Sequence, residues 1–215
     1  MIAKPVLTLL VLALGLVAAG SAWSQSSWEG PTGAYLNPLA LNLARSQVQG
    51  GTHYLDLQPA GALTTFGVSY GLTNRLEIGV TQNDLSVGSA AKVNVLHAKY
   101  LLRPLAPGQP GVAVGAVWRS ATQDTADFYA VATQIFPTRQ PLIASVTVRS
   151  TNARGSGLFG RAAGRSIQWG GFLGVQVTPH LIPNVEYLAQ AEGEDWADVG
   201  VRYVVNANTN WDFGL

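Results

Sequence analysis

Five ionisable residues fall where opposite charges could meet inside a wall of strands. Glu77 and Glu186 each follow a tight turn, and Lys99 and Arg202 lie near the ends of segments that return toward such turns. His97 shares the alternation phase of Lys99. This placement predicts an interior charge layer of Glu77, His97, Lys99, Glu186 and Arg202. Such a layer would either cross-link the wall or select solutes.

Arginine dominates the stretch between Asp127 and Glu186, which contains no acid. The planar guanidinium binds carboxylates and phosphates through its fork of donors. We therefore predict a basic patch at an outer mouth and its loops, formed by Arg119, Arg149, Arg154, Arg161 and Arg165, that attracts an anionic solute or polymer. The alternatives are contact with lipid head-group phosphates and a flexible solvated loop.

Catalytic, metal and cofactor sites have little support in the sequence. The chain has no cysteine, and its three histidines, His53, His97 and His180, show no metal-ligand spacing. In a strand, His53 and Asp56 would project from opposite faces, which argues against a Ser–His–acid set there. No phosphate-binding loop or dinucleotide fingerprint is present. We expect no enzyme activity, no metal, no cofactor and no nucleic-acid partner.

The residues from Gln47 onward alternate between apolar and small or polar types with a period of two, which predicts β-strands. The clearest stretches are Thr65–Leu72, Leu76–Thr81, Val112–Arg119, Leu142–Arg149 and Ile167–Val177. Further strands are predicted at Gln47–Leu57, Lys92–Leu102, Asp127–Phe136, Leu181–Glu192 and from Trp196. About ten strands result, with the length that a tilted membrane-crossing strand requires, roughly 9–11 residues.

The polar faces of these strands are too small and too neutral for a solvated surface. Charged residues make up only 12% of the chain, about half the share usual in soluble domains. Aromatic residues fall at strand ends, as in a membrane-interface belt; they are Tyr70, Tyr100, Phe136, Trp118, Tyr129 and Trp169. We therefore predict an all-β, antiparallel up-and-down transmembrane β-barrel with apolar residues facing lipid, rather than a soluble sandwich with an apolar core.

The connections and the chain ends divide the sequence into three parts. Residues 1–24 have the charge, apolar run and small residues of a cleaved signal peptide. Residues 25–46 form an N-terminal lead that lies in the periplasm or tucks into the lumen, and residues 47–215 form the barrel. Longer outer loops are predicted at Asn83–Ala91, Ser120–Ala126 and Ser150–Arg165.

Two segments resemble those of known barrels. The final residues, Trp211-Asp212-Phe213-Gly214-Leu215, look like the terminal assembly signal of small Gram-negative outer-membrane β-barrels, although they end in Leu rather than an aromatic residue. The segment WEGPTGAYLNPLA (Trp28–Ala40) is similar to the opening of the YjbH-like barrels linked to exopolysaccharide loci. The resemblance implies an envelope location and passage of a solute or polymer, and it supplies no catalytic residues.

Two questions of strand number stay open. Alternation from Val199 to Leu215 fits either one long closing strand or a hairpin at Asn206–Asn210 with an eleventh short strand. Because bacterial barrels normally have even strand numbers, ten strands are predicted, with twelve as the alternative if Ala34–Asn42 adds one.

These patterns together predict a barrel in the cell outer membrane, in contact with outer-membrane lipid and lipopolysaccharide. Its expected function is that of a small pore or an accessory barrel for passage of an anionic solute or polysaccharide. The alternative is a non-conducting structural or partner-binding barrel, because side chains can largely fill so narrow an interior.

Overall fold

The computed structural model describes residues 25–27, 29–34, 36–56, 61–86, 91–106, 108–120, 123–154, 161–190, 195–206 and 209–214. The predicted signal peptide lies outside these ranges. Every element within them is a β-strand, and they include no helix with the length and apolar character needed to cross a membrane.

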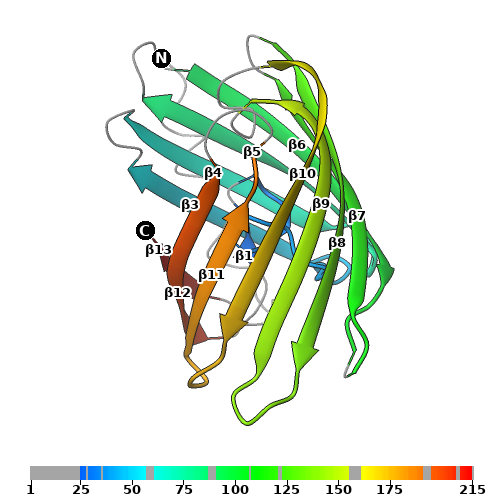
Figure 1. Cartoon of the computed structure of the whole chain (residues 1–215), viewed down its shortest axis with the longest axis vertical. Helices are drawn as coiled ribbons and strands as arrows, with labels where there is room; N and C mark the ends of the chain where they lie inside the picture. The colour runs from blue at the N-terminus through cyan, green and yellow to red at the C-terminus, as the bar shows by residue number, and fades with distance from the viewer. Residues whose placement is uncertain are drawn as a thin grey trace.

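Eleven strands form one antiparallel up-and-down sheet in which each strand pairs with its neighbours in sequence (Figure 1). The strands are β3 Val48–Asp56, β4 Ala62–Gly71, β5 Leu76–Ser86, β6 Ala91–Arg103, β7 Gly111–Ser120, β8 Thr125–Phe136, β9 Leu142–Ala153, β10 Arg161–Val175, β11 Leu181–Leu188, β12 Trp196–Asn206 and β13 Thr209–Gly214. A separate small sheet pairs β1 (Gln25–Ser26) with β2 (Thr32–Gly33). The predicted all-β, antiparallel up-and-down organisation is confirmed.

The sheet curves strongly, and its two edges are β3 and β13, which do not pair in the described part of the chain (Figure 1). Ten antiparallel pairings lie between these two strands, so they run in the same direction. Direct pairing of the edges would therefore be parallel.

One face of the sheet, the outer face, carries large apolar side chains that remain exposed. Val146 is 60% exposed, Ile167 70% and Val199 64%. The opposite, inner face buries polar and charged side chains, including Glu77, which is 0% exposed. Successive side chains of a strand point to opposite faces, and the phase predicted for each clear stretch is the phase observed.

The described residues of the N-terminal lead (25–27, 29–34 and 36–46) pack against the inner face, where Figure 1 shows β1 inside the curve of the sheet. Ala34 and Leu39 of the lead are buried against Ile143 on β9 and Phe172 on β10. The amide of Ala40 donates to the Thr133 hydroxyl at 2.8 Å. The lead is therefore the segment that buries the inner face.

Three predictions about element boundaries are wrong. The strands continue into the polar ranges that were expected to be longer loops, so the connection after β9 spans only residues 154–160. The reason is that buried polar residues such as Asn83, Thr125 and Thr151 lie on the inner face, where a polar residue type does not indicate exposure to solvent.

The prediction that Tyr129 belongs to an exposed aromatic belt is also wrong, because Tyr129 lies on the inner face and is buried.

The end of the chain forms a hairpin. β12 and β13 pair with Tyr203 opposite Trp211, so one long closing strand is excluded and the main sheet has eleven described strands rather than ten. The described residues of 34–42 add no strand to this sheet, because they lie inside the curve as part of the lead.

Candidate functional site

The inner face carries a transverse row of side chains at one level of the sheet. Strand register aligns Glu77, Lys99, Gly115, Tyr129 and Arg149 on five successive strands, β5 to β9. The ammonium of Lys99 lies 3.5 Å from the Glu77 carboxylate, and both side chains are fully buried. The Tyr129 ring lies across the glycine, because a Cβ added to Gly115 would fall 2.3 Å from its Cζ atom.

Glu77 binds the lead at two points. Its Oε1 atom accepts a hydrogen bond of 2.7 Å from the Thr32 amide, and its Oε2 atom accepts one of 3.1 Å from the Leu43 amide. The Thr32 hydroxyl also donates to Oε2, and His97 Nε2 lies 3.8 Å from Oε1. A carboxylate of the curved sheet, which we call the wall, thus accepts the hydrogen bonds that two backbone amides of the lead would otherwise donate to water.

A tight turn in the lead sets the position of Glu29. The Ser27 amide donates to the Pro31 carbonyl, and the Gly30 amide donates to the Ser27 carbonyl, each at 2.8 Å. Gly30 has φ of 108°, and a Cβ at this position would lie 2.5 Å from His97 Nδ1. Both its backbone conformation and its surroundings therefore require glycine.

Glu29 reaches a cluster of two arginines and one aspartate. Arg119 Nη2 contacts Glu29 Oε1 and lies 2.8 Å from Asp127 Oδ2. Arg149 Nη1 lies 2.9 Å from Glu29 Oε2 and 3.2 Å from Asp127 Oδ2. Thr151 donates to the other oxygen of Asp127. All four charged side chains are buried, so two positive charges balance two negative ones within the fold.

Glu186 anchors the middle of the lead. Its Oε2 atom accepts hydrogen bonds from the amides of Leu36 at 2.9 Å and Asn37 at 3.0 Å. The Asn37 side chain also donates to the carbonyl of Tyr187 at 3.2 Å. A third part of the lead is thus held by a carboxylate of the sheet.

The structure therefore divides the predicted interior charge layer into three groups. Glu77, His97 and Lys99 lie together. Glu186, which lies on β11, instead binds amides of the lead. Arg202 forms a two-fold hydrogen-bonded pair with Asp212 on β13, at 2.9 and 3.0 Å. Pairing of opposite charges on the inner face is observed, but across several separate contacts.

The predicted basic patch is not one surface. Arg119 and Arg149 are 1% exposed and belong to the inner face, and strand register places Arg149 in the row of Glu77 and Lys99. The place predicted for these two residues, in an exposed patch at an outer mouth, was wrong, because Asp127 on the strand between them and Glu29 of the lead pair with both arginines on the inner face. Arg154, Arg161 and Arg165 are exposed.

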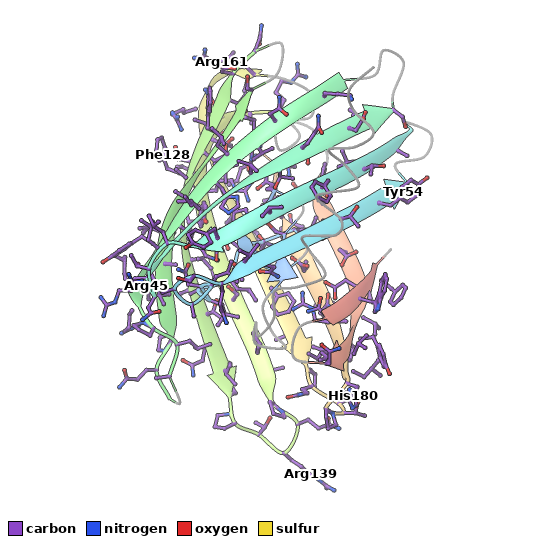
Figure 2. All side chains as sticks on the ribbon, turned by 180° about the vertical axis from the view of Figure 1, so that it is seen from behind. Arg45, Tyr54, Phe128, Arg139, Arg161 and His180 are labelled. Atoms are coloured by element: carbon purple, nitrogen blue, oxygen red, sulfur yellow. The ribbon has the colours of Figure 1, made fainter. Side chains whose placement is uncertain are left out.

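The three exposed arginines of the predicted patch follow the end of β9 or lie at the start of β10, toward one end of the sheet. Figure 2 places Arg161 at the end opposite Arg139 and His180. The guanidinium of Arg165 stacks over the Phe128 ring at 5.2 Å from its centroid. These residues remain candidates for head-group contact, separate from the inner site.

Outside the strands, Asp195 in the connection after β11 has a shifted pKa. The Tyr187 hydroxyl donates to Asp195, and the Gln190 amide donates to its Oδ1 atom at 2.9 Å. These hydrogen bonds lower the pKa of Asp195 below its ordinary value.

Sequence reasoning missed the lead residues that complete the site, Glu29, Thr32 and Asn37. A usable signal existed for Glu29, which is the single charged residue between Gln25 and Ala44. A lone charge in a segment that packs inside a fold needs a buried partner. All three residues fall within the segment Trp28–Ala40.

The site binds peptide amides and balances charge, and the described residues include no group of three or more His, Asp or Glu side chains that could hold a metal ion. No protein-family model matches the chain, and neither a curated protein nor a solved structure matches it.

Proposed function

We propose that the curved sheet is a β-barrel of the bacterial outer membrane that holds its N-terminal lead inside as a plug. The observation that carries this proposal is the distribution of side chains: large apolar residues stay exposed on the outer face, whereas the inner face buries ion pairs beside its apolar clusters. Lipid is the solvent that suits such an outer face. With the lead held inside, the barrel does not conduct, and it serves as an accessory or partner-binding barrel of the envelope.

Closure of the wall is part of the proposal. An open sheet edge in hydrocarbon leaves backbone groups unsatisfied, at several kcal/mol each. We propose that β3 and β13 meet at a parallel seam. Because the chain has no native cysteine, single cysteines placed in β3 and in β13 report this contact by disulfide formation. Absence of any cross-link over a full scan of both strands would contradict a β3–β13 seam.

A second candidate function is passage of a solute or polysaccharide when the lead moves. The wall beneath the lead supports it, because Thr133, Ser145 and Thr147 are buried hydroxyl residues on the inner face. A wall that only enclosed a permanent core would be more stable with apolar residues there. Hydroxyl groups instead suit a surface that water contacts once the lead is displaced.

A disulfide that fixes the lead distinguishes these functions. The pair Ala40→Cys and Thr133→Cys joins the lead to β8, where the two residues make a hydrogen bond. The matched control, Thr133→Cys with Ser145→Cys, joins two wall residues whose hydroxyls lie 3.1 Å apart. Conductance is measured in planar bilayers before and after reduction.

The proposal expects no conductance from the lead-locked protein. Conductance that appears only after reduction supports passage gated by the lead, and silence in both states supports the closed barrel. Equal conductance in locked and reduced protein would refute the plug. The membrane location is tested separately, by heat-modifiable gel migration of the protein from outer-membrane extracts, and a mature chain that is soluble without detergent would refute it.

A further inference from the structure

The arginine cluster differs from the other charge pairs of the inner face in the origin of its members. Arg119, Arg149 and Asp127 belong to the wall, on β7, β9 and β8, whereas Glu29 belongs to the lead. We propose that Arg119 and Arg149 form a binding site for a carboxylate-bearing solute and that Glu29 is its internal occupant. This inference rests on the proposed function and names the class of ligand that the interior takes.

The wall part of the cluster is fixed without Glu29. Asp127 accepts hydrogen bonds from Arg119 at 2.8 Å and from Arg149 at 3.2 Å. The Thr151 hydroxyl, on the neighbouring strand, holds its second oxygen. Displacement of the lead therefore removes one carboxylate and leaves two arginines beside one aspartate, with a net charge of +1.

Each of the two arginines also has guanidinium donors that neither Glu29 nor Asp127 fills. Arg119 Nε and Nη1 and Arg149 Nε are buried and have no hydrogen-bond partner among the described groups of the protein, as is also true of the Tyr129 hydroxyl. Guanidinium groups only donate, so the missing partners must be acceptors. A buried cation without a counter-charge is strongly unfavourable. Displacement of the lead also takes away the acceptors that Glu29 supplies to Arg119 and Arg149, so an anion is the ligand that restores both the hydrogen bonds and the charge balance.

The contacts of Glu29 identify the class of anion. One carboxylate oxygen contacts Arg119, and the other lies 2.9 Å from Arg149, so the two oxygens bridge two guanidinium groups. A second carboxylate reproduces this arrangement with the same charge, and it is carried by small organic acids and by uronic-acid sugars. The tight turn at Gly30 presents Glu29 from a compact loop, as an external ligand would present its own carboxylate.

Removal of the internal occupant tests this site. Glu29→Ala vacates the position, and Glu29→Ala with Arg149→Met removes both the occupant and one arginine. Thermal unfolding of the purified mature chain is measured in detergent with acetate, glucuronate, glucose or inorganic phosphate. Sodium chloride is added so that all samples have the same ionic strength. With carboxylate at tenfold its dissociation constant, the Tm of the Glu29→Ala protein should rise by about 3–5 °C. The wild type and the double variant should not respond.

Three outcomes would overturn the site: no shift in Glu29→Ala, an equal shift in the double variant, or a response to phosphate without one to acetate and glucuronate. If Glu29→Ala does not fold in chloride, refolding in acetate replaces melting as the readout, and failure to recover folded protein in acetate or glucuronate overturns the site as well. Neither readout uses conductance or location. A protein that is stabilised by carboxylate but conducts equally when locked would refute the plug alone.

Discussion

Glu77→Gln should release the lead from the inner face. The Glu77 carboxylate receives the Thr32 amide and hydroxyl and the Leu43 amide on its two oxygens. A glutamine keeps one acceptor oxygen and presents a donor on the other side, so at least one of these lead amides faces another donor.

The expected loss follows from that count. A hydrogen bond to a charged group contributes about 1.5–3 kcal/mol, so losing one shifts docking of the lead by about tenfold to hundredfold. Asp84→Asn is the matched control, because Asp84 lies on the same strand and pairs with Lys92 at 3.6 Å in a solvent-exposed position. A surface ion pair contributes about 0.2–1 kcal/mol, so the control should change exchange by less than about fivefold.

Hydrogen–deuterium exchange measured by mass spectrometry gives this ratio directly, from the peptide that covers residues 29–44. The Glu77→Gln protein should exchange these amides about ten to a hundred times faster than the wild type. Exchange as slow as in Asp84→Asn would show that Glu77 does not hold the lead, and would refute the reasoning from the buried carboxylate.

Three further predictions concern two strand positions of the sheet and one of its connections. Gly115→Ala should lower the free energy of unfolding by about 1–3 kcal/mol through overpacking, whereas Gly164→Ala, where an added Cβ meets nothing within 4 Å, should change it little; urea unfolding compares them. Val146→Arg should weaken folding into lipid vesicles by about 2–4 kcal/mol if this outer-face position lies at the membrane midplane, and an unchanged midpoint would place it elsewhere. Tyr187→Phe should raise the pKa of Asp195 toward its ordinary value, because the hydroxyl that stabilises the carboxylate is lost; carboxyl NMR titration measures the shift.

The alternation of residue types was enough to predict which side chains share a face. Leu142–Arg149 shows why: each residue is set by the pleat of its own strand, so Val146 is outward and Thr147 inward without knowledge of any other strand. Strand ends were less predictable, because Thr125 and Thr151 look like loop residues but continue the inner face.

The site itself depends on relations between strands that one strand does not encode. Arg149 shares a row with Lys99 only because of the register of three intervening pairings. The binding of lead amides by Glu77 and Glu186 depends on where an irregular segment docks, and no periodicity specifies that. Composition could predict that buried charges need partners, but not which ones.

The docked lead also has a consequence for folding kinetics. The sheet consists of hairpins between strands adjacent in sequence, which close short loops and form early. The lead makes the opposite kind of contact: the hydrogen bond from Leu36 to Glu186 joins residues 150 positions apart. Contacts between residues so far apart in sequence form slowly. The lead can therefore dock at Glu186 only after β11 has been synthesised and has folded. We expect refolding to show a fast phase for the hairpins and a slow phase for docking of the lead against the sheet.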